Sequence, residues 1–385
     1  MNNKCVIIAG EMSADILGYE IISSNSNIEW HGVGGPYMNQ TKLKSIFDWE
    51  KIIGFGLVEI ILKLPILLYN AHILANKIIQ IKPKLIVTVD TKGFNFFLIK
   101  LIRNKLKLNS YKPRFIHLVA PTVWAWRPGR AKKISKIVDT LLCLFPKEID
   151  YFKDLELETK FVGHPAVRTF YLVRNRSKLF SKLDMKDNKE IVISLLPGSR
   201  ASEVKKTLPI LILTTKILKS KIKKPLLFLC QAAPNQESLV QSILSQYEND
   251  ILIAKKNFIG NEITASSDFS IITSGTATLE FALNGVPSIA IYKTNFLSAF
   301  IGRKIINMNN IILPNWILGK KHIEFLFQEN CNPQKISQEI INLINNKEKI
   351  KGFNLNAKKL RELLTANNNT FKENVSNVIQ HYLYV

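Results

Sequence analysis

Residues 269–292 read FSIITSGTATLEFALNGVPSIAIY, two apolar runs separated by a stretch of helical composition. The first run, Phe269–Thr273, ends at Ser274-Gly275, and the second is Pro287–Tyr292. Runs that are apolar at consecutive positions, rather than at alternate ones, are typical of strands buried on both faces of a parallel sheet. The stretch therefore predicts a strand–helix–strand unit with parallel strands.

The same pattern recurs through most of the 385-residue chain, as apolar runs that each end near a polar residue, a glycine or a proline. Four runs precede residue 150 and two more follow it: Cys5–Ala9, Leu85–Val89, Phe115–Val119, Thr140–Leu144, Glu190–Leu196 and Pro225–Cys230. Two successive series of strand–helix units predict an α/β protein with two Rossmann-like, doubly wound parallel-sheet domains that face a cleft.

A polar and basic stretch, Arg174–Glu190, separates the two series and predicts the domain boundary. We expect a first domain at residues 1–175 and a second at residues 176–355. The remaining residues, 356–385, are polar and helical in composition. The sequence leaves open whether this segment packs on the first domain or on a partner.

The composition narrows the class of protein. The net charge is +23, which favours an anionic partner, although Lys, Asn and Ile are abundant throughout and overall compositional drift explains the charge equally well. The four cysteines lack CxxC spacing, which predicts buried thiols and no metal site. No secretory signal is seen, and Glu59, Lys63 and Pro65 interrupt the most apolar segment, Gly54–Leu68. We expect a cytoplasmic protein that at most lies on a membrane surface.

Ligands of open parallel sheets bind beyond the carboxyl ends of the strands, so we look for functional residues there. Ser274, Gly275 and Thr276 lead from a strand into a helix, whose first backbone N–H groups and dipole would attract a diphosphate. Glu280, one turn later, would accept hydrogen bonds from ribose hydroxyls. The alternative is an ordinary capped helix with a solvated glutamate.

The sequence LLPGSRASEV at residues 195–204 is a second strand–turn–helix element. Its Pro-Gly pair favours a tight turn. Ser199 and Arg200 follow, and a guanidinium offers a planar, permanently charged fork to phosphate oxygens. Arg200 would thereby stabilise a leaving diphosphate in the transition state. The alternative is a surface arginine on a capped helix.

Two carboxylates also follow predicted strands. Asp90 ends the run Leu85–Val89, where partial desolvation would suit a general base; the alternative is a helix N-cap. Glu11 is its nearest rival, and its alternative is a first-turn carboxylate favoured by the helix dipole. His117 and His164 also lie near strand ends, but a lone histidine is more often structural, and we assign neither a catalytic role.

Residues 121–130, PTVWAWRPGR, place two tryptophans beside two arginines: Trp124, Trp126, Arg127 and Arg130. Aromatic rings with basic neighbours can stack on a base, hold a sugar or contact a lipid headgroup. Because no RNA-binding motif accompanies them, we expect no nucleic-acid partner and place them on the acceptor or membrane side.

Taken together, these motifs resemble the lipid-A-disaccharide synthase family over almost the whole chain, and they occur in its order. The motifs are AGEMSADILG (9–18), GVGGPYM (32–38), VDTKGFNF (89–96), PTVWAWRPGR (121–130), FVGHP (161–165), LLPGSRASEV (195–204), SGTATLEFALNGVPSIAIY (274–292) and LPNWILGK (313–320). Two positions depart from the family pattern. Ala14 stands where the family usually has glycine, and Gly93 replaces the usual second acid, which leaves Asp90 as the best candidate base.

The resemblance implies a GT-B fold and a hexosyltransferase that inverts the anomeric carbon. It would transfer 2,3-diacylglucosamine from its UDP derivative to 2,3-diacylglucosamine 1-phosphate, forming the β-1,6-linked disaccharide 1-phosphate and UDP. It would act at the inner face of the cytoplasmic membrane. The first domain would then bear the acceptor and membrane side, and the second the UDP-sugar site. The family residues carried over by motif are Glu11, Asp90, Arg200, Glu280 and Asn315.

We therefore expect a single displacement in which Asp90, or its rival Glu11, is the base and Arg200 stabilises departing UDP. No DxD motif occurs, so we expect neither a metal nor another cofactor. Ile61 and Leu68 would contact an anionic membrane surface, and a homodimer is left open. The alternative enzyme is a UDP-sugar 2-epimerase-like isomerase, which needs no acceptor. A non-catalytic basic module that binds RNA or anionic lipid is the other alternative.

Overall fold

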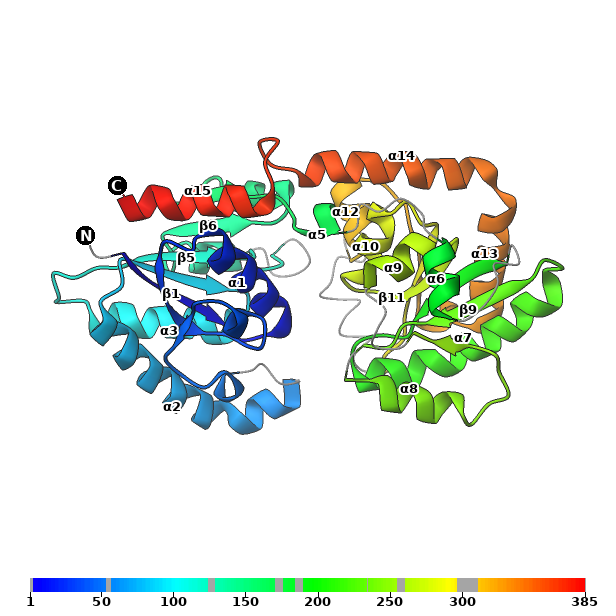
Figure 1. Cartoon of the computed structure of the whole chain (residues 1–385), viewed down its shortest axis with the longest axis horizontal. Coiled ribbons are helices and arrows are strands. Elements are labelled where there is room, and N and C mark those ends of the chain that lie inside the picture. Colours follow the sequence, from blue (N-terminus) through cyan, green and yellow to red (C-terminus); the bar gives the residue numbers. More distant parts are fainter. Residues whose placement is uncertain are drawn as a thin grey trace. The chain divides into compact units, whose positions relative to one another are not determined.

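The structure is a computed structural model that describes residues 3–52, 57–123, 129–169, 176–183, 190–233, 235–254, 260–295 and 311–384, with only the backbone described at 57–63, 178 and 260. The chain forms two compact units (Figure 1). Unit 1 comprises Met1–Pro165 and Leu364–Val385, and unit 2 comprises Ala166–Leu363. The boundary thus follows residue 165 rather than residue 175, and the C-terminal segment 356–385 is divided between the units.

Unit 1 contains a seven-stranded sheet in the order β3-β2-β1-β4-β5-β6-β7, with every pair parallel. Its strands are β1 (Lys4–Ala9), β2 (Glu29–Val33), β3 (Lys44–Ser45), β4 (Leu85–Val89), β5 (Arg114–Leu118), β6 (Thr140–Cys143) and β7 (Glu158–Phe161). Its helices are α1 (Met12–Ser24), α2 (Leu57–Ile81), α3 (Lys92–Lys105), α4 (Arg130–Ile134) and α15 (Phe371–Tyr384), with short 3-10 turns at η1 (Met38–Gln40), η2 (Trp49–Lys51) and η3 (Pro146–Tyr151).

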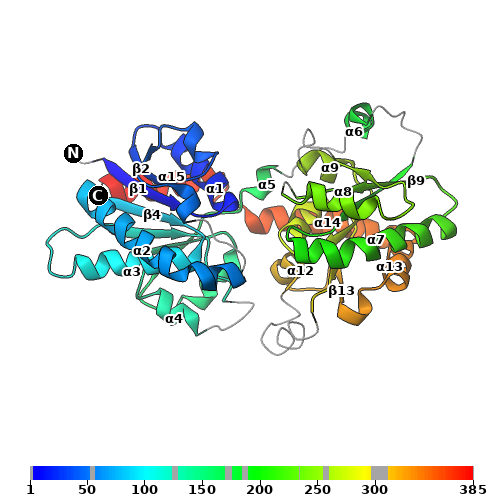
Figure 2. The same ribbon diagram turned by 90° about the horizontal axis from the view of Figure 1, so that it is seen from below.

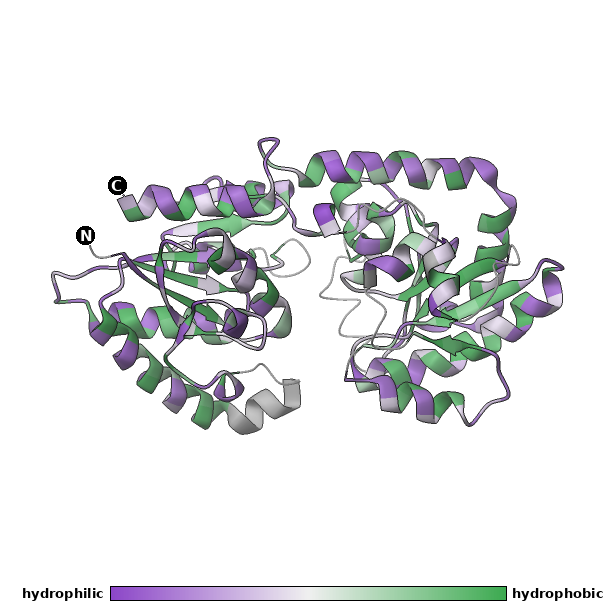
Figure 3. Cartoon of the chain, viewed as in Figure 1, coloured by the Kyte–Doolittle hydropathy of each residue, from purple (hydrophilic) through white to green (hydrophobic). Residues whose placement is uncertain are grey.

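Helices cover both faces of this sheet, with α2 and α3 on one face and α1 and α15 on the other (Figures 1 and 2). Val6 and Ile8 of β1 belong to the core cluster that contains buried residues of α2, α3 and α4. Cys5 and Ile7, also fully buried, alternate with them toward the opposite face. Burial on both faces explains why the strand is apolar at consecutive positions (Figure 3).

Helix α1 connects to the loop before η1 through a buried carboxylate. Asp15 accepts hydrogen bonds from the backbone N–H groups of Gly35 (2.7 Å), Tyr37 (2.8 Å) and Met38 (3.1 Å). An unpaired buried carboxylate is costly, and three donors satisfy this one. Ala14, which replaces the usual glycine of the resembled family, is fully buried inside regular helix, so the substitution leaves the backbone after Glu11 helical.

The C-terminal helix α15 packs on unit 1 against α1 and β4. At its end, the Tyr382 hydroxyl donates to the Glu158 carboxylate of β7. The Arg114 guanidinium of β5 lies 3.8 Å from the centre of the Tyr382 ring and also pairs with Glu158 at 2.5 Å. These contacts join the chain's last turn to two strands of the first sheet.

Unit 2 contains a six-stranded parallel sheet in the order β10-β9-β8-β11-β12-β13. The strands are β8 (Ile191–Leu196), β9 (Leu226–Cys230), β10 (Leu252–Ile253), β11 (Phe269–Thr273), β12 (Ser288–Tyr292) and β13 (Glu324–Phe327). The helices are α5 (Ala166–Thr169), α6 (Arg176–Lys182), α7 (Ala201–Lys221), α8 (Glu237–Leu244), α9 (Gly260–Ser266), α10 (Ala277–Leu283), α12 (Leu313–Leu318), α13 (Pro333–Asn345) and α14 (Lys347–Leu364), with a 3-10 turn at η5 (Gln328–Asn330). The strand–helix–strand unit predicted at residues 269–292 is confirmed as β11, α10 and β12, with Ile271 paired to Ile289 in a parallel ladder.

Helix α2 accounts for most of the apolar segment that the sequence marks as closest to a membrane span. It runs through Pro65, and its later part buries Ala71, Leu74, Ala75 and Ile78 in the core. Among the described residues, no helix combines the length and apolar character needed to cross a bilayer.

Candidate functional site

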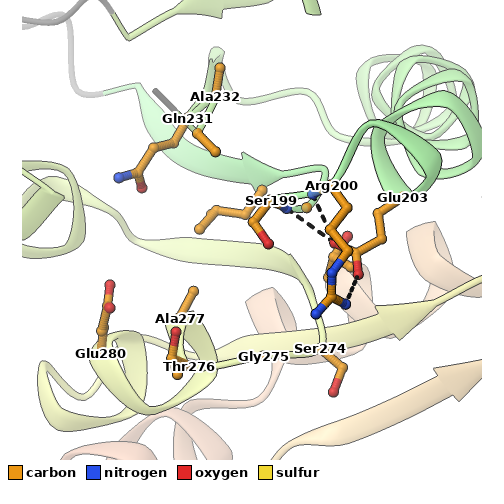
Figure 4. Close-up of a pocket in the computed structure, with 14 residues that line it drawn as sticks. Ser199, Arg200, Glu203, Gln231, Ala232, Ser274, Gly275, Thr276, Ala277 and Glu280 are labelled. Carbon is orange, nitrogen blue, oxygen red and sulfur yellow. Dashed lines mark hydrogen bonds and ion pairs between the residues drawn. The ribbon is translucent and has the colours of Figure 1, made fainter. Parts of the chain in front are cut away.

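The carboxyl edge of the unit 2 sheet holds a cavity of about 420 Å³ (Figure 4). Three loops line it, those that follow β8, β9 and β11. β8 is the strand from which the sheet order runs in both directions, to β9 on one side and to β11 on the other. Loops leave such a topological switch point toward opposite faces of the sheet, which opens a crevice for ligands. The cavity therefore lies where the fold itself predicts a binding site.

The loop after β8 is shaped by the carboxylate of Glu203. Its Oε2 accepts hydrogen bonds from the backbone N–H groups of Ser199 (3.1 Å) and Arg200 (3.3 Å). Gly198 adopts a φ of +118°, and a Cβ there would lie 2.7 Å from the Glu203 side chain. A glycine is needed at this position for both reasons. Glu203, which sequence reasoning did not single out, sits three residues after the N-cap, a position typical of carboxylates that turn back to cap a helix.

Arg200 is the N-cap of α7 and extends into the cavity (Figure 4). Its side chain is 74% exposed, and its Nη1 atom pairs with Glu203 Oε1 at 3.1 Å. Because one carboxylate holds only one edge of the guanidinium, the remaining N–H donors can meet a second anion in the cavity. Arg200 is thus a positioned, solvent-accessible cation that follows the end of β8.

The turn after β11 forms the opposite wall. Ser274, Gly275 and Thr276 line the cavity, and Thr276 is the N-cap of α10. Thr278 closes the turn by donating from its hydroxyl to the Gly275 carbonyl at 2.7 Å. Predicted residues from two loops, Ser199 and Arg200 together with Ser274–Thr276, are therefore brought to one cavity.

Glu280, on α10, completes the described lining from this side. Burial raises the pKa of its carboxyl from 4.5 to about 7. A carboxyl in a cavity whose pKa is raised by desolvation is a candidate functional group.

We expect Glu280→Gln to stabilise the fold and weaken nucleotide binding. Because the folded pKa lies above 4.5, the contribution of Glu280 to stability is fully present below pH 4.5 and is lost as pH rises through about 7. The variant should therefore exceed the wild type by roughly 1–3 kcal/mol in the free energy of unfolding at pH 8, and by much less at pH 5, in urea titrations. UDP should bind on the order of tenfold more weakly, since a charge-assisted hydrogen bond is lost.

Glu237→Gln on α8 is the control, and it should change neither the free energy of unfolding nor the affinity for UDP. An equal pH dependence of stability in both variants would contradict the assignment of Glu280.

Unit 1 has its own switch point, between β1 and β4. The register pairs Ala9 with Val89, so Glu11 and Asp90 follow neighbouring strand ends. The Gly10 N–H donates to the Thr91 hydroxyl at 3.2 Å, which ties the two loops together. The two rival bases thus lie at the same edge of the sheet.

Asp90 and Thr91 both adopt left-handed backbone conformations, with φ of 43° and 41°. Such conformations are uncommon outside glycine and asparagine and cluster at functional sites. Asn95 holds the turn by donating from its amide to the carbonyl of Asp90 at 2.9 Å. Lys92 pairs with the Asp90 carboxylate at 3.0 Å, and both side chains are about a quarter exposed. At Gly93, where the resembled family has its second acid, a Cβ would meet no atom within 4 Å. The chain therefore carries one acid and one lysine at this turn.

Asn315 lies outside the residues that line the unit 2 cavity. Its Oδ1 accepts from the N–H groups of His322 (3.0 Å) and Ile323 (2.8 Å), and its Nδ2 donates to the Ile323 carbonyl (2.8 Å). These bonds use the amide to hold the loop that precedes β13.

The predicted acceptor and membrane residues are only partly described. Trp124, Trp126 and Arg127 lie outside the described residues, as does the side chain of Ile61. Arg130 begins α4 and Leu68 lies in α2, and both are half-buried. Among the described side chains of α2, the exposed large apolar ones are Leu64 (47%), Ile66 (60%) and Tyr69 (67%).

Comparison with known proteins identifies similar sequences and similar folds. The lipid-A-disaccharide synthetase family matches residues 5–379. The lipid-A-disaccharide synthase of Wigglesworthia glossinidia brevipalpis is 35% identical over 350 residues, covering 90% of this chain and 89% of the relative. UDP-GlcNAc 2-epimerase from Neisseria meningitidis bound to UDP-GlcNAc has a TM-score of 0.62 at 11% identity over 99% of both chains. The calicheamicin glycosyltransferase CalG4 has a TM-score of 0.60 at 10% identity, covering 100% of this chain and 99% of that one. The solved structures show the fold alone, and the expected GT-B fold is confirmed.

Proposed function

This chain belongs to the lipid-A-disaccharide synthetase family and is a hexosyltransferase that forms the lipid A disaccharide. From this we propose which substrate binds at the topological switch point of each unit. Unit 2 binds UDP-2,3-diacylglucosamine as the donor. Unit 1 presents 2,3-diacylglucosamine 1-phosphate as the acceptor and supplies the base. The observation that carries the proposal is the cavity at the end of β8 and β11, with one arginine, one helix start and one perturbed glutamate.

The cavity offers hydrogen-bonding groups that suit a nucleoside diphosphate. Arg200 supplies donors for the phosphates, and the turn Ser274–Thr276 before α10 lies in the same lining. The N–H groups of Thr278 and Leu279 already donate to the Gly275 and Thr276 carbonyls. Glu280 lies four residues beyond Thr276, where a carboxylate can accept from the two ribose hydroxyls. The solved epimerase of the same fold is bound to UDP-GlcNAc, which supports a UDP-sugar as the ligand class.

In the proposed reaction the 6-hydroxyl of the acceptor attacks the anomeric carbon of the donor in one displacement. The new O6–C1 bond forms as the bond between C1 and the UDP oxygen breaks, which inverts the configuration. Asp90 accepts the hydroxyl proton, and Glu11 is the rival base at the same sheet edge. Arg200 stabilises the charge that develops on the departing diphosphate.

An acceptor-dependence assay tests this function directly. Purified protein is mixed with UDP-2,3-diacylglucosamine, with and without 2,3-diacylglucosamine 1-phosphate, and UDP and disaccharide are measured. We expect both products only when the acceptor is present. Conversion of the donor without acceptor would instead support an isomerase, the class to which the epimerase with the same fold belongs.

We also propose that unit 1 meets the cytoplasmic face of the membrane through α2, because acylated substrates reside there. Leu64, Ile66 and Tyr69 are exposed in the part of α2 that precedes its buried stretch. An exposed apolar group on an amphipathic helix gains free energy when it enters the lipid interface.

We expect the double variant Leu64→Ser with Ile66→Ser to weaken binding to phosphatidylcholine vesicles by at least roughly tenfold, since apolar burial is lost. The apparent KM for the acylated acceptor should rise, while UDP affinity stays normal. Leu213→Ser with Leu355→Ser, two exposed leucines of unit 2, is the matched control. Unchanged sedimentation with vesicles would remove α2 from the membrane contact.

A further inference from the structure

Half of the chain's net charge is concentrated in one stretch of unit 1. Residues 91–138 carry twelve Lys and Arg and no Asp or Glu, whereas residues 1–90 carry eight basic and eight acidic side chains. This local contrast points to a cause for the charge beyond the overall composition of the chain. Apart from residues 124–128, which lie outside the described residues, the stretch comprises α3, β5, α4 and the loops that adjoin them.

A second cavity, of about 260 Å³, opens within this stretch. It is lined by Arg103, Leu106, Lys107, Lys112, Pro113 and Phe115. Pro113 and Phe115 lie at the amino end of β5, whereas Asp90 follows the carboxyl end of the neighbouring strand β4. The cavity is therefore at the opposite edge of the sheet from the proposed base.

The charges around this cavity are not all available for a ligand. Arg103 is committed, because it pairs with Asp139 at 2.7 Å, donates to the Ile137 carbonyl at 2.8 Å and stacks 4.6 Å from the Phe115 ring centre. That pair also neutralises the Asp139 carboxylate. Lys107 and Lys112 are exposed, and no ion pair joins either to another described residue. Two ammonium groups thus flank an apolar floor of Leu106, Pro113 and Phe115.

The loop between the two lysines is held by hydrogen bonds and exposes a leucine. Asn109 accepts from the Tyr111 N–H at 2.9 Å through its side chain, and its own N–H donates to the Leu106 carbonyl at 3.0 Å. The Tyr111 hydroxyl ties the loop to the Pro83 carbonyl at 2.6 Å. Leu108, in this held loop, is 99% exposed. An exposed leucine beside cations suits the surface of a bilayer, whose headgroups are anionic and whose interior is apolar.

We propose that this cavity binds the phosphate of an anionic phospholipid headgroup, with Lys107 and Lys112 as its cations and Leu108 entering the lipid interface. The site adds a charge-selective contact to the apolar contact proposed for α2, and it is independent of the catalytic assignment. Lys105, exposed at the end of α3, adds to the positive potential that draws this part of unit 1 toward an anionic surface.

Vesicle sedimentation tests the site with the whole chain. Vesicles of phosphatidylcholine alone are compared with vesicles containing one quarter phosphatidylglycerol, at 50 and 300 mM salt. We expect Lys107→Gln with Lys112→Gln to lower affinity for the phosphatidylglycerol vesicles by roughly 10- to 30-fold at low salt, and to leave binding to neutral vesicles unchanged. Leu108→Ser should weaken binding to the anionic vesicles while keeping its salt dependence. Turnover of detergent-dispersed substrates should be normal in both variants.

The matched control is Lys223→Gln with Lys224→Gln, which removes the same charge from two exposed lysines of unit 2. An equal loss in the control would show general electrostatic attraction and overturn the site. Wild-type affinity of the Lys107/Lys112 variant for anionic vesicles would overturn it as well. Release of the wild type by millimolar inorganic phosphate at constant ionic strength would show a site for free phosphate rather than for lipid. If the α2 variant binds vesicles like the wild type while the Lys107/Lys112 variant binds anionic vesicles more weakly, the α2 contact fails and the headgroup site is supported.

Discussion

Replacing Asp90 by Asn is expected to lower kcat by about 10²–10⁴-fold while leaving UDP affinity nearly unchanged. The substitution removes basicity and keeps shape, and general-base catalysis typically contributes on this scale. Asparagine also tolerates the left-handed backbone that Asp90 adopts, with a φ of 43°, so the turn should persist. The measurements are single-turnover rates with both acylated sugars and UDP binding by calorimetry.

Two further variants separate basicity from the local charge balance. Glu11→Gln alters the rival carboxylate at the same sheet edge and should cost much less than Asp90→Asn. Lys92→Met removes the partner that lies 3.0 Å from Asp90 and keeps the length of the side chain. Near-normal turnover in Asp90→Asn, with a large loss in Glu11→Gln, would move the base to Glu11.

Replacing Arg200 by Ala is expected to lower kcat by roughly 10²–10³-fold, the effect of losing one preorganised donor to the transition state. Arg200→Lys should restore little, because an ammonium lacks the planar fork that meets two phosphate oxygens. The loop itself should survive, since the backbone N–H groups of Ser199 and Arg200 bond to Glu203 whatever side chain stands at position 200. The measurement is kcat with saturating donor and acceptor.

Lys205→Ala is the control for this second prediction. Lys205 is an exposed cation on α7 that does not line the cavity, so its loss changes the net charge without touching the site. We expect a rate within about twofold of the wild type, as for a surface charge. Full activity in Arg200→Lys would show that any positive charge suffices, and full activity in Arg200→Ala would remove the residue from the reaction.

The sequence predicted eight of the thirteen described strands and several residues that line the unit 2 cavity, and it missed β2, β3, β7, β10 and β13, which are short or lie toward the sheet edges. Consecutive apolar residues reported strands buried on both faces, as at Cys5–Ala9, because burial is a local requirement of each strand. Residues that directly follow parallel strands also gather predictably, because all the carboxyl ends lie at one edge. That rule predicts that Arg200 and Gly275 lie close together, and both line one cavity with Glu280, which follows one helical turn later.

Side-chain partners and unit boundaries were settled by tertiary structure alone. Nothing in the local sequence pattern shows that the Asn315 amide accepts a hydrogen bond from the His322 N–H group, or that Lys92 pairs with Asp90. Long polar side chains reach several neighbours in different rotamers, and only the packing of distant segments decides which neighbour is present. The same holds for α15, which follows unit 2 in sequence but packs on unit 1. Periodicity records how deeply a segment is buried, whereas its partner depends on contacts between residues far apart in the chain.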